Sequence, residues 1–213
     1  MKRKILYISN SLFPYGQAYS TRIVNFARLF NALGYDIHVI TDFTHEKFIN
    51  SETIKNFENC TYQIVAGKAT SLNRIKSTFI SIKIIEEYIN SNKVDYVIIG
   101  NCYDRFNRVK KICNKKGIPL ILEICEWYDT KTRKFGNLNP YNIIYNRCMK
   151  YDYTKADGYI TISRYLYEHF SKYSKNIIRI PTILNPDDTP CSVETKNEKV
   201  RLVHLGFSGI HKE

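Results

Sequence analysis

Hydrophobic positions along this chain fall into two alternating kinds of segment. Short runs that are apolar at nearly every position predict strands buried on both faces. These runs cover 4–9, 36–41, 60–65, 95–100, 118–124, 158–163 and 176–181. Longer stretches with apolar residues at helical spacing predict helices. They cover 20–33, 72–91, 104–116, 140–155 and 164–173. In the second helix the predicted inward face carries Ile75, Phe79, Ile82, Ile85 and Ile89.

This alternation predicts an α/β fold: a doubly wound, mostly parallel, Rossmann-like sheet of about seven strands with helices on both faces. The predicted domain covers 1–181. Residues 182–199 carry two prolines, many polar side chains and no periodicity, which indicates a linker. Another apolar run, VRLVHLG, then begins at 200, so 200–213 are predicted to open a second domain.

Charge is the strongest signal in the composition. A formal net charge of +12 favours an anionic partner such as a membrane surface, a phosphorylated substrate or nucleic acid. The basic residues are spread over several predicted helices and no nucleic-acid-binding module appears, so no specific nucleic-acid partner is expected.

Cysteine and histidine spacing predicts no metal site. None of the six cysteines forms a C-x-x-C pair, and the five histidines are scattered. No apolar run approaches the roughly 18 residues of a membrane-spanning helix. The apolar stretch at the N-terminus is too short for a secretory signal, so a cytoplasmic protein is expected.

In such sheets ligands bind beyond the carboxyl ends of the strands. After the first strand, Gly16 would let the backbone approach a ligand. Ser20, Thr21 and Arg22 open the next helix, where backbone N–H groups could hold a phosphate or a sugar hydroxyl. Alternatively, Ser20 only caps this helix. The stretch lacks the G-x-G-x-x-G pattern, which counts against a dehydrogenase.

The loop after 118–124 has the most unusual composition, with Glu126, Trp127, Tyr128 and Asp129 in succession. Aromatic faces beside carboxylates suit a sugar, which offers C–H faces to rings and hydroxyls to acids. An equally good explanation for the tryptophan is that it anchors the loop on the core.

Three further residues follow strands and are candidates for the same cleft. Asn101 follows 95–100, Ser163 is the last residue of 158–163, and Arg164 follows it. Capping of the next helix also explains Ser163, and it explains Asp104 in the same way.

The helix over 104–116 is strongly two-sided. Its polar side carries basic residues with no acid after Asp104. This pattern is typical of a solvated face or of one that rests on an anionic membrane. The proposed membrane patch consists of Arg105, Arg108, Lys111 and Lys115.

Several stretches together resemble the N-terminal half of a GT-B-fold glycosyltransferase of family 4. They are KILYISNSLFPYGQAYSTRIVNFARLFNALGYDIHVIT, DYVIIGN, PLILEICEWYD, RCMKYDYTKADGYITISRYLYEHF, IIRIPTILN and VRLVHLGFSGIHKE. The resemblance implies that the chain stops at the start of the donor domain. It also implies that Gly206, Gly209 and Lys212 face the pyrophosphate of a nucleotide-sugar.

The resemblance implies a retaining, metal-independent transferase without a cofactor, the nucleotide-sugar being a donor substrate. The acceptor would be a polysaccharide or a lipid-linked glycan in cell-surface glycan biosynthesis, reached at the inner face of the membrane. The fragment alone would be inactive. The alternative is a non-catalytic, Rossmann-like binding module.

Overall fold

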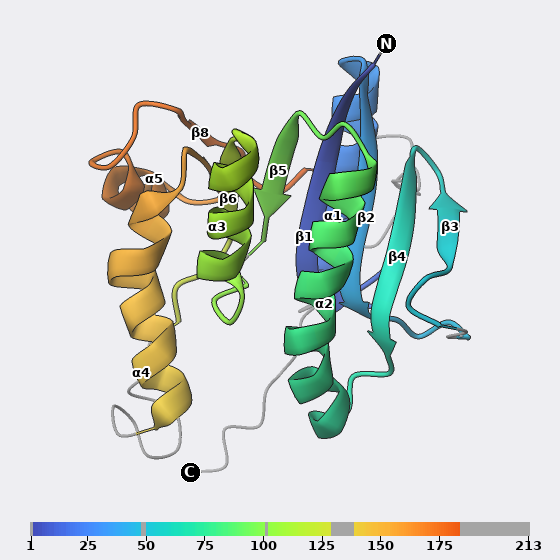
Figure 1. The fold of residues 1–213 in the computed structure, drawn as a ribbon. Helices are drawn as coiled ribbons and strands as arrows, with labels where there is room; N and C mark the ends of the chain where they lie inside the picture. Colours follow the sequence, from blue (N-terminus) through green and yellow to red (C-terminus); the bar gives the residue numbers. More distant parts are fainter. Residues whose placement is uncertain (1, 48–49, 101, 129–138, 184–213) are drawn as a thin grey trace, which may run out of the picture.

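The computed structural model describes residues 2–47, 50–100, 102–128 and 139–183 (Figure 1). Within these residues eight strands form one sheet in the order β3-β4-β2-β1-β5-β6-β7-β8. Only the β3–β4 pair is antiparallel. The predicted doubly wound α/β class is therefore confirmed.

The predicted strands and helices are all present, and most differ only by a few residues at their ends, but the α-helix predicted over 140–155 ends at Arg147. The strands are β1 (Arg3–Leu12), β2 (Tyr35–Phe43), β3 (Ile54–Phe57), β4 (Cys60–Gly67), β5 (Tyr96–Ile99), β6 (Leu120–Ile124), β7 (Gly158–Thr161) and β8 (Ile177–Arg179). The helices are α1 (Ala18–Ala32), α2 (Ser71–Ser91), α3 (Phe106–Lys116), α4 (Pro140–Arg147) and α5 (Arg164–Phe170). After α4 the chain continues through a π-helical turn at Cys148–Asp152 and a 3₁₀ turn at Tyr153–Lys155.

Among the strands of the described residues, β3 is the one that the hydrophobic pattern did not predict. It is four residues long, lies at the sheet edge, and alternates exposed with half-buried positions. A short edge strand of this kind carries no continuous apolar run, and pairing with β4 supplies its stability.

The direction of the crossovers decides which face each helix covers. From β4 to β8 the chain advances across the sheet in one direction, and right-handed crossovers place α2 to α5 on one face. The step from β1 to β2 runs the opposite way, so α1 covers the other face (Figure 1). Two hydrophobic clusters, one on each face of the sheet, form the core.

The predicted inward face of α2 is correct only for the second half of the helix. Ile85 and Ile89 are buried, but Ile75 and Phe79 are 64% and 63% exposed. In the first half Ser77 points inward instead, and its hydroxyl donates to Asp42 Oδ2 at 3.0 Å. The buried carboxylate at the end of β2 therefore turns the apolar side of this half outward. No helix among the described residues has the length and apolarity to cross a membrane.

Candidate functional site

A crevice of about 330 Å³ opens at the carboxyl ends of the strands, next to the point where strand order reverses between β1 and β5. This is the position at which doubly wound sheets bind ligands. The described residues that line it are Asn10, Ser11, Leu12, Gln17, Tyr19, Phe43, Ala69, Arg74, Tyr103, Cys125, Glu126, Tyr128 and Tyr145.

Gly16 shapes the first loop without lining the crevice itself. Its φ is +111°, which favours glycine, and a Cβ there would lie 2.6 Å from the His45 ring. Glycine thus lets the loop pack against His45. The consequence is that Gln17 and Tyr19, which follow it, reach the crevice wall.

Ser20 and Thr21 do not reach the crevice. The cap position of α1 is Gln17, and the Ser20 hydroxyl, fully buried, donates to the carbonyl oxygen of Leu12 at 2.7 Å. The predicted cap at Ser20 is therefore wrong, because the helix begins earlier. Thr21 lies on the exposed side of α1.

Arg22 is buried, with 6% of its side chain exposed, rather than lying open in the cleft. Its Nε donates to Oε1 of Glu123 at 2.7 Å. Its two terminal nitrogens donate to the carbonyl oxygens of Pro181 and Ile180, at 2.6 and 2.8 Å. Burial works against the charge of Arg22, but the Glu123 carboxylate raises the pKa of the guanidinium. Arg22 therefore links β6 to the segment that follows β8.

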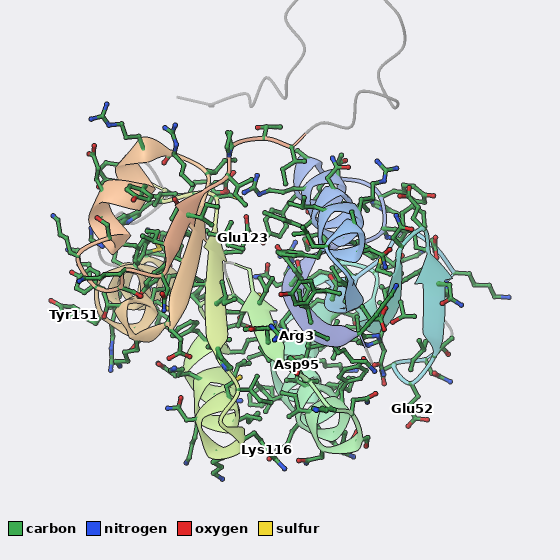
Figure 2. The ribbon with its side chains drawn as sticks, turned by 90° about the horizontal axis from the view of Figure 1, so that it is seen from above. Arg3, Glu52, Asp95, Lys116, Glu123 and Tyr151 are labelled. Carbon is green, nitrogen blue, oxygen red and sulfur yellow. The ribbon has the colours of Figure 1, made fainter. Side chains whose placement is uncertain are left out.

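Glu123 is the centre of a buried polar network behind the crevice wall. The Tyr7 hydroxyl donates to Oε2 of Glu123 at 3.2 Å, and the Tyr19 hydroxyl donates to the same oxygen. The Cys125 thiol donates to Oε1 at 3.0 Å. Burial and the neighbouring carboxylate raise the pKa of Tyr7 and of Tyr19, which keeps both hydroxyls protonated as donors. In Figure 2 Glu123 lies in the interior, between α1 and the strands.

Glu126 and Tyr128 do line the crevice, and hydrogen bonds to the Tyr145 hydroxyl hold the loop that carries them. The Tyr128 N–H donates to the Tyr145 hydroxyl at 3.1 Å, and that hydroxyl donates to the Glu126 carbonyl oxygen at 3.2 Å. Glu126 is exposed at the crevice surface, and desolvation by the atoms around it raises the pKa of its carboxyl. A carboxyl of this kind is suited to proton exchange with a bound hydroxyl.

Trp127 points away from the crevice. Its ring packs against Tyr165 and His169 of α5, with centroids 6.0 and 4.8 Å apart. Of the two interpretations of this tryptophan, the contacts favour the anchor on the core.

Ser163 and Arg164 also lie outside the crevice lining. Ser163 caps α5 by accepting the Leu166 N–H at 3.3 Å. The Arg164 side chain is 82% exposed and pairs with Glu168 at 2.7 Å. Five predicted site residues lie outside the described part of the chain: Asn101, Asp129, Gly206, Gly209 and Lys212.

The prediction that Arg105 belongs to the membrane patch is wrong, because the residue is buried. Its side chain is 2% exposed, and its two terminal nitrogens each donate to one oxygen of Asp42 at 2.7 Å. Asp104 does not cap α3 but bonds to Arg105 and to Thr78. The patch therefore reduces to three residues, all of them exposed: Arg108, Lys111 and Lys115.

Most of the remaining lining residues were missed because they come from five separate strand ends. Arg74 is the cationic side chain among the described lining residues, and its guanidinium carbon lies 5.3 Å from the centroid of the Phe43 ring. Its place four residues after the cap of α2, Thr70, was the one available signal. Among the described residues no group of three or more His, Cys, Asp or Glu side chains could hold a metal ion.

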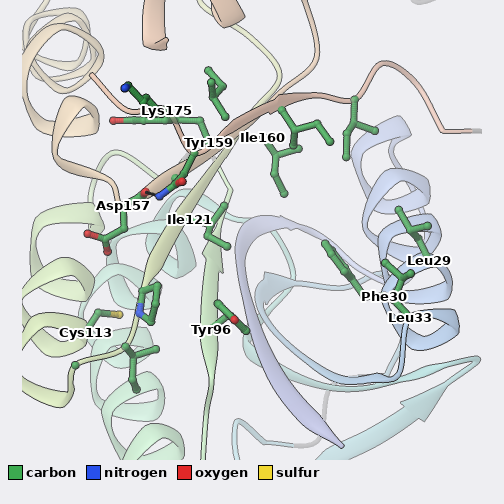
Figure 3. A pocket seen from close by; sticks show the side chains of 18 of the residues that line it. Leu29, Phe30, Leu33, Tyr96, Cys113, Ile121, Asp157, Tyr159, Ile160 and Lys175 are labelled. Atoms are coloured by element: carbon green, nitrogen blue, oxygen red, sulfur yellow. Dashed lines mark hydrogen bonds between the residues drawn. The ribbon is translucent and has the colours of Figure 1, made fainter. Parts of the chain in front are cut away.

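A larger cavity, of about 1040 Å³, lies at the opposite end of the sheet (Figure 3). It is mainly apolar and runs from Leu33 at the end of α1 past Ile121 and Ile160 to the amino ends of β7 and β8. By volume alone, this cavity would be the stronger candidate for the ligand site. The smaller crevice has the convergent polar groups and the position that ligand sites share.

Residues 20–188 match the model of glycosyltransferase family 4. The chain belongs to this family. The expected resemblance is confirmed, and the described sheet is that of the N-terminal half of a GT-B glycosyltransferase. No curated protein matches the sequence of this family 4 member.

Solved structures share the fold of this family 4 domain at low sequence identity. The catalytic domain of starch synthase IV from Arabidopsis thaliana, bound to ADP and acarbose, matches with a TM-score of 0.59 and 10% identity, over 88% of this chain and 53% of its own. Sucrose-phosphate synthase from Thermosynechococcus elongatus matches with a TM-score of 0.58 and 12% identity, over 84% of this chain and 48% of its own. A UGT transferase from Siraitia grosvenorii in complex with UDP matches with a TM-score of 0.56 and 8% identity, over 88% of this chain and 53% of its own. The chain therefore spans about half the length of these structures.

Proposed function

We propose that this chain forms the acceptor-binding half of a retaining glycosyltransferase. The enzyme would transfer a sugar from a nucleotide-sugar to a polysaccharide or lipid-linked acceptor in cell-surface glycan biosynthesis. The observation that carries the proposal is the position of Glu126. This exposed carboxyl has a raised pKa and lines the crevice at the switch point of a family 4 domain.

The crevice offers groups of the kind that recognise a sugar. The amides of Asn10 and Gln17 can exchange hydrogen bonds with hydroxyls, and Tyr128, 44% exposed, presents a ring to C–H faces. A volume of about 330 Å³ is at the lower end of the range for small-ligand pockets, which suits the terminal sugar of an acceptor.

Arg74 adds a preference for an acceptor that carries phosphate. Its guanidinium lies beside the crevice, and arginine binds phosphate oxygens in a bidentate manner. A lipid-linked acceptor joined through phosphate would place its sugar beside Glu126 and its phosphate near Arg74.

The donor side of the proposal concerns residues outside the described part of the chain. Gly206, Gly209 and Lys212 would hold the pyrophosphate, with Asn101 and Asp129 at the cleft. Two of the similar structures contain ADP or UDP, which supports a nucleoside diphosphate as the leaving group. The proposed transfer uses no cofactor, because the nucleotide-sugar is itself the activated donor, and we propose that it is metal-independent.

Replacing the crevice carboxyl tests the proposal. In the full-length protein, Glu126→Gln should lower kcat for sugar transfer at least about a hundredfold, as loss of an acid–base group does, with an unchanged urea midpoint. Glu168→Gln is the matched control, because Glu168 lies exposed on α5.

Wild-type activity of Glu126→Gln would contradict the assignment. A protein that binds a glycan in the crevice yet turns over no nucleotide-sugar would instead favour the non-catalytic binding module.

A further inference from the structure

The first half of α2 exposes three large apolar side chains in one line. Leu72, Ile75 and Phe79 are 61%, 64% and 63% exposed, and their spacing of three and four residues places them on one side of the helix. We call these three residues the apolar stripe. A contiguous line of exposed apolar side chains on a helix indicates a site that binds a membrane or another apolar surface.

Basic side chains surround the apolar stripe. Residues 71–83 contain Arg74, Lys76 and Lys83 and no acidic residue. The guanidinium carbon of Arg108 on α3 lies 5.6 Å from the centroid of the Phe79 ring, so the stripe continues into the basic side of α3. That side exposes Arg108, Lys111 and Lys115, and residues 106–116 contain no acid either.

The apolar stripe lies beside the mouth of the crevice. Arg74, which lines the crevice, lies between Leu72 and Ile75 in the sequence. Figure 1 shows α2 and α3 side by side on the same face, with the N-terminal end of α2 at the carboxyl-end edge of the sheet. A surface that contacts the stripe would therefore lie next to the crevice.

We infer that the apolar stripe and the exposed basic side of α3 dock this protein on an anionic phospholipid surface. Leu72, Ile75 and Phe79 would enter the boundary between headgroups and acyl chains, while the arginines and lysines meet the headgroup phosphates. The net charge of +12 adds a long-range attraction to such a surface. Nucleic acid would match the charge but offers no apolar layer for the stripe.

The inference deepens the proposed function and rests on it in one respect. It explains how the crevice would reach an acceptor that is anchored in lipid. The docking itself needs no sugar transfer, so the two are measured separately.

Co-sedimentation of the full-length protein with vesicles tests the inference. Vesicles of phosphatidylcholine mixed with phosphatidylglycerol should bind the protein, and binding should fall as salt rises. Pure phosphatidylcholine vesicles should bind it far more weakly. Lys111→Gln should weaken binding about fivefold. The double variant Ile75→Ser/Phe79→Ser should weaken vesicle binding at least about tenfold. This loss should persist at high salt, since the lost contact is apolar.

Matched controls come from the opposite end of the sheet. Leu33→Ser and Lys175→Gln make the same chemical changes at exposed sites beside the large cavity, and both should bind like wild type. Urea unfolding of every variant checks the fold. Equal binding of wild type to neutral and anionic vesicles would overturn the inference, as would equal loss in the controls.

Sugar transfer to a soluble acceptor separates this inference from the proposed function. We expect wild-type turnover of that acceptor by Ile75→Ser/Phe79→Ser. Vesicle binding that follows the predicted pattern, with no transfer by any variant, would refute the proposed function and leave the docking surface intact.

Discussion

Arg22 and Arg105 are two buried arginines that solve the same physical problem differently. Each is 6% exposed or less, and each must offset the cost of removing a charge from water. Arg105 meets two carboxylates, Asp42 and Asp104. Arg22 meets one carboxylate, Glu123, and completes its hydrogen bonding with two backbone carbonyl groups.

The difference shows what each arginine holds together. Arg105 joins the start of α3 to the end of β2, so it fixes the helical layer on the sheet. Arg22 joins β6 to Ile180 and Pro181, the segment that leaves β8. Since Glu123 also holds Tyr19 and Cys125, which line the crevice, this second network connects the crevice wall to that segment.

The largest expected effect is the loss of the Arg105 charge. Arg105→Met should lower the free energy of unfolding by about 3–5 kcal/mol, because Asp42 would remain buried without a cation and with only the Ser77 hydroxyl as a donor. Urea denaturation measures this loss. Lys111→Met, one exposed position on the same helix, should change the free energy of unfolding by less than about 0.5 kcal/mol.

Glu123→Gln should lower the free energy of unfolding somewhat less than Arg105→Met does, by about 3 kcal/mol. The amide oxygen can still accept a hydrogen bond from Arg22, and the two carbonyl partners of Arg22 remain. This variant should also speed hydrogen exchange at the Ile180 amide, which donates to Thr161, beyond what global destabilisation explains. Arg105→Met, at matched stability, should leave that local exchange unchanged. Equal local exchange in both variants would remove the distinction between the two networks.

His38 extends the comparison, because it is a buried basic group that no carboxylate of the described residues pairs with. Burial, with a smaller contribution from Lys4, lowers its pKa from 6.5 to about 4, and its ring stacks on Tyr88. The unfolded chain therefore takes up the proton first as the pH falls. The free energy of unfolding should drop through the window from 6.5 to about 4, by about 2 kcal/mol between pH 7 and pH 5.

Chemical denaturation at a series of pH values measures this dependence. A His38→Gln variant should lose this part of the pH dependence. An unchanged slope in the variant would show that another group causes it.

Within the Glu123 network, Tyr7→Phe should lower the free energy of unfolding less than Glu123→Gln does, by about 1 kcal/mol. It removes one donor from Glu123 and leaves Arg22, Tyr19 and Cys125 in place. Tyr62→Phe is the comparison, because the Tyr62 hydroxyl donates to Glu46, whose carboxylate also keeps Lys55 and contact with water. Thermal unfolding should show a larger loss for Tyr7→Phe. The reverse order would mean that Glu123 is adequately satisfied without Tyr7.

Several features of the site followed from local sequence. The loop that carries Glu126 and Tyr128 was predicted at the crevice because it directly follows a buried parallel strand. Ser163 was predicted as one possible cap of α5, and it is that cap. These features depend on neighbours in the chain, which a sequence displays directly.

Other features depend on residues that are distant in the sequence. Arg22 and Glu123 are 101 positions apart, and Arg105 and Asp42 are 63 apart. Trp127 could equally have faced a ligand or the core until α5 supplied Tyr165 and His169. The pattern placed Ile75 and Phe79 on an inward face, and only the Asp42–Ser77 contact shows why that half of α2 turns outward.

The sequence by itself determined the class of fold, the order of the strands and helices, and the edge of the sheet where the crevice lies. Hydrophobic periodicity encodes these properties, because each buried strand and each helix must hide its own apolar side chains. Only the tertiary structure decided which charges are buried, which aromatic rings face the crevice and which side of α2 meets solvent. Those outcomes depend on partners that meet only when the sheet has assembled, since a buried charge is stable only beside the group that compensates it.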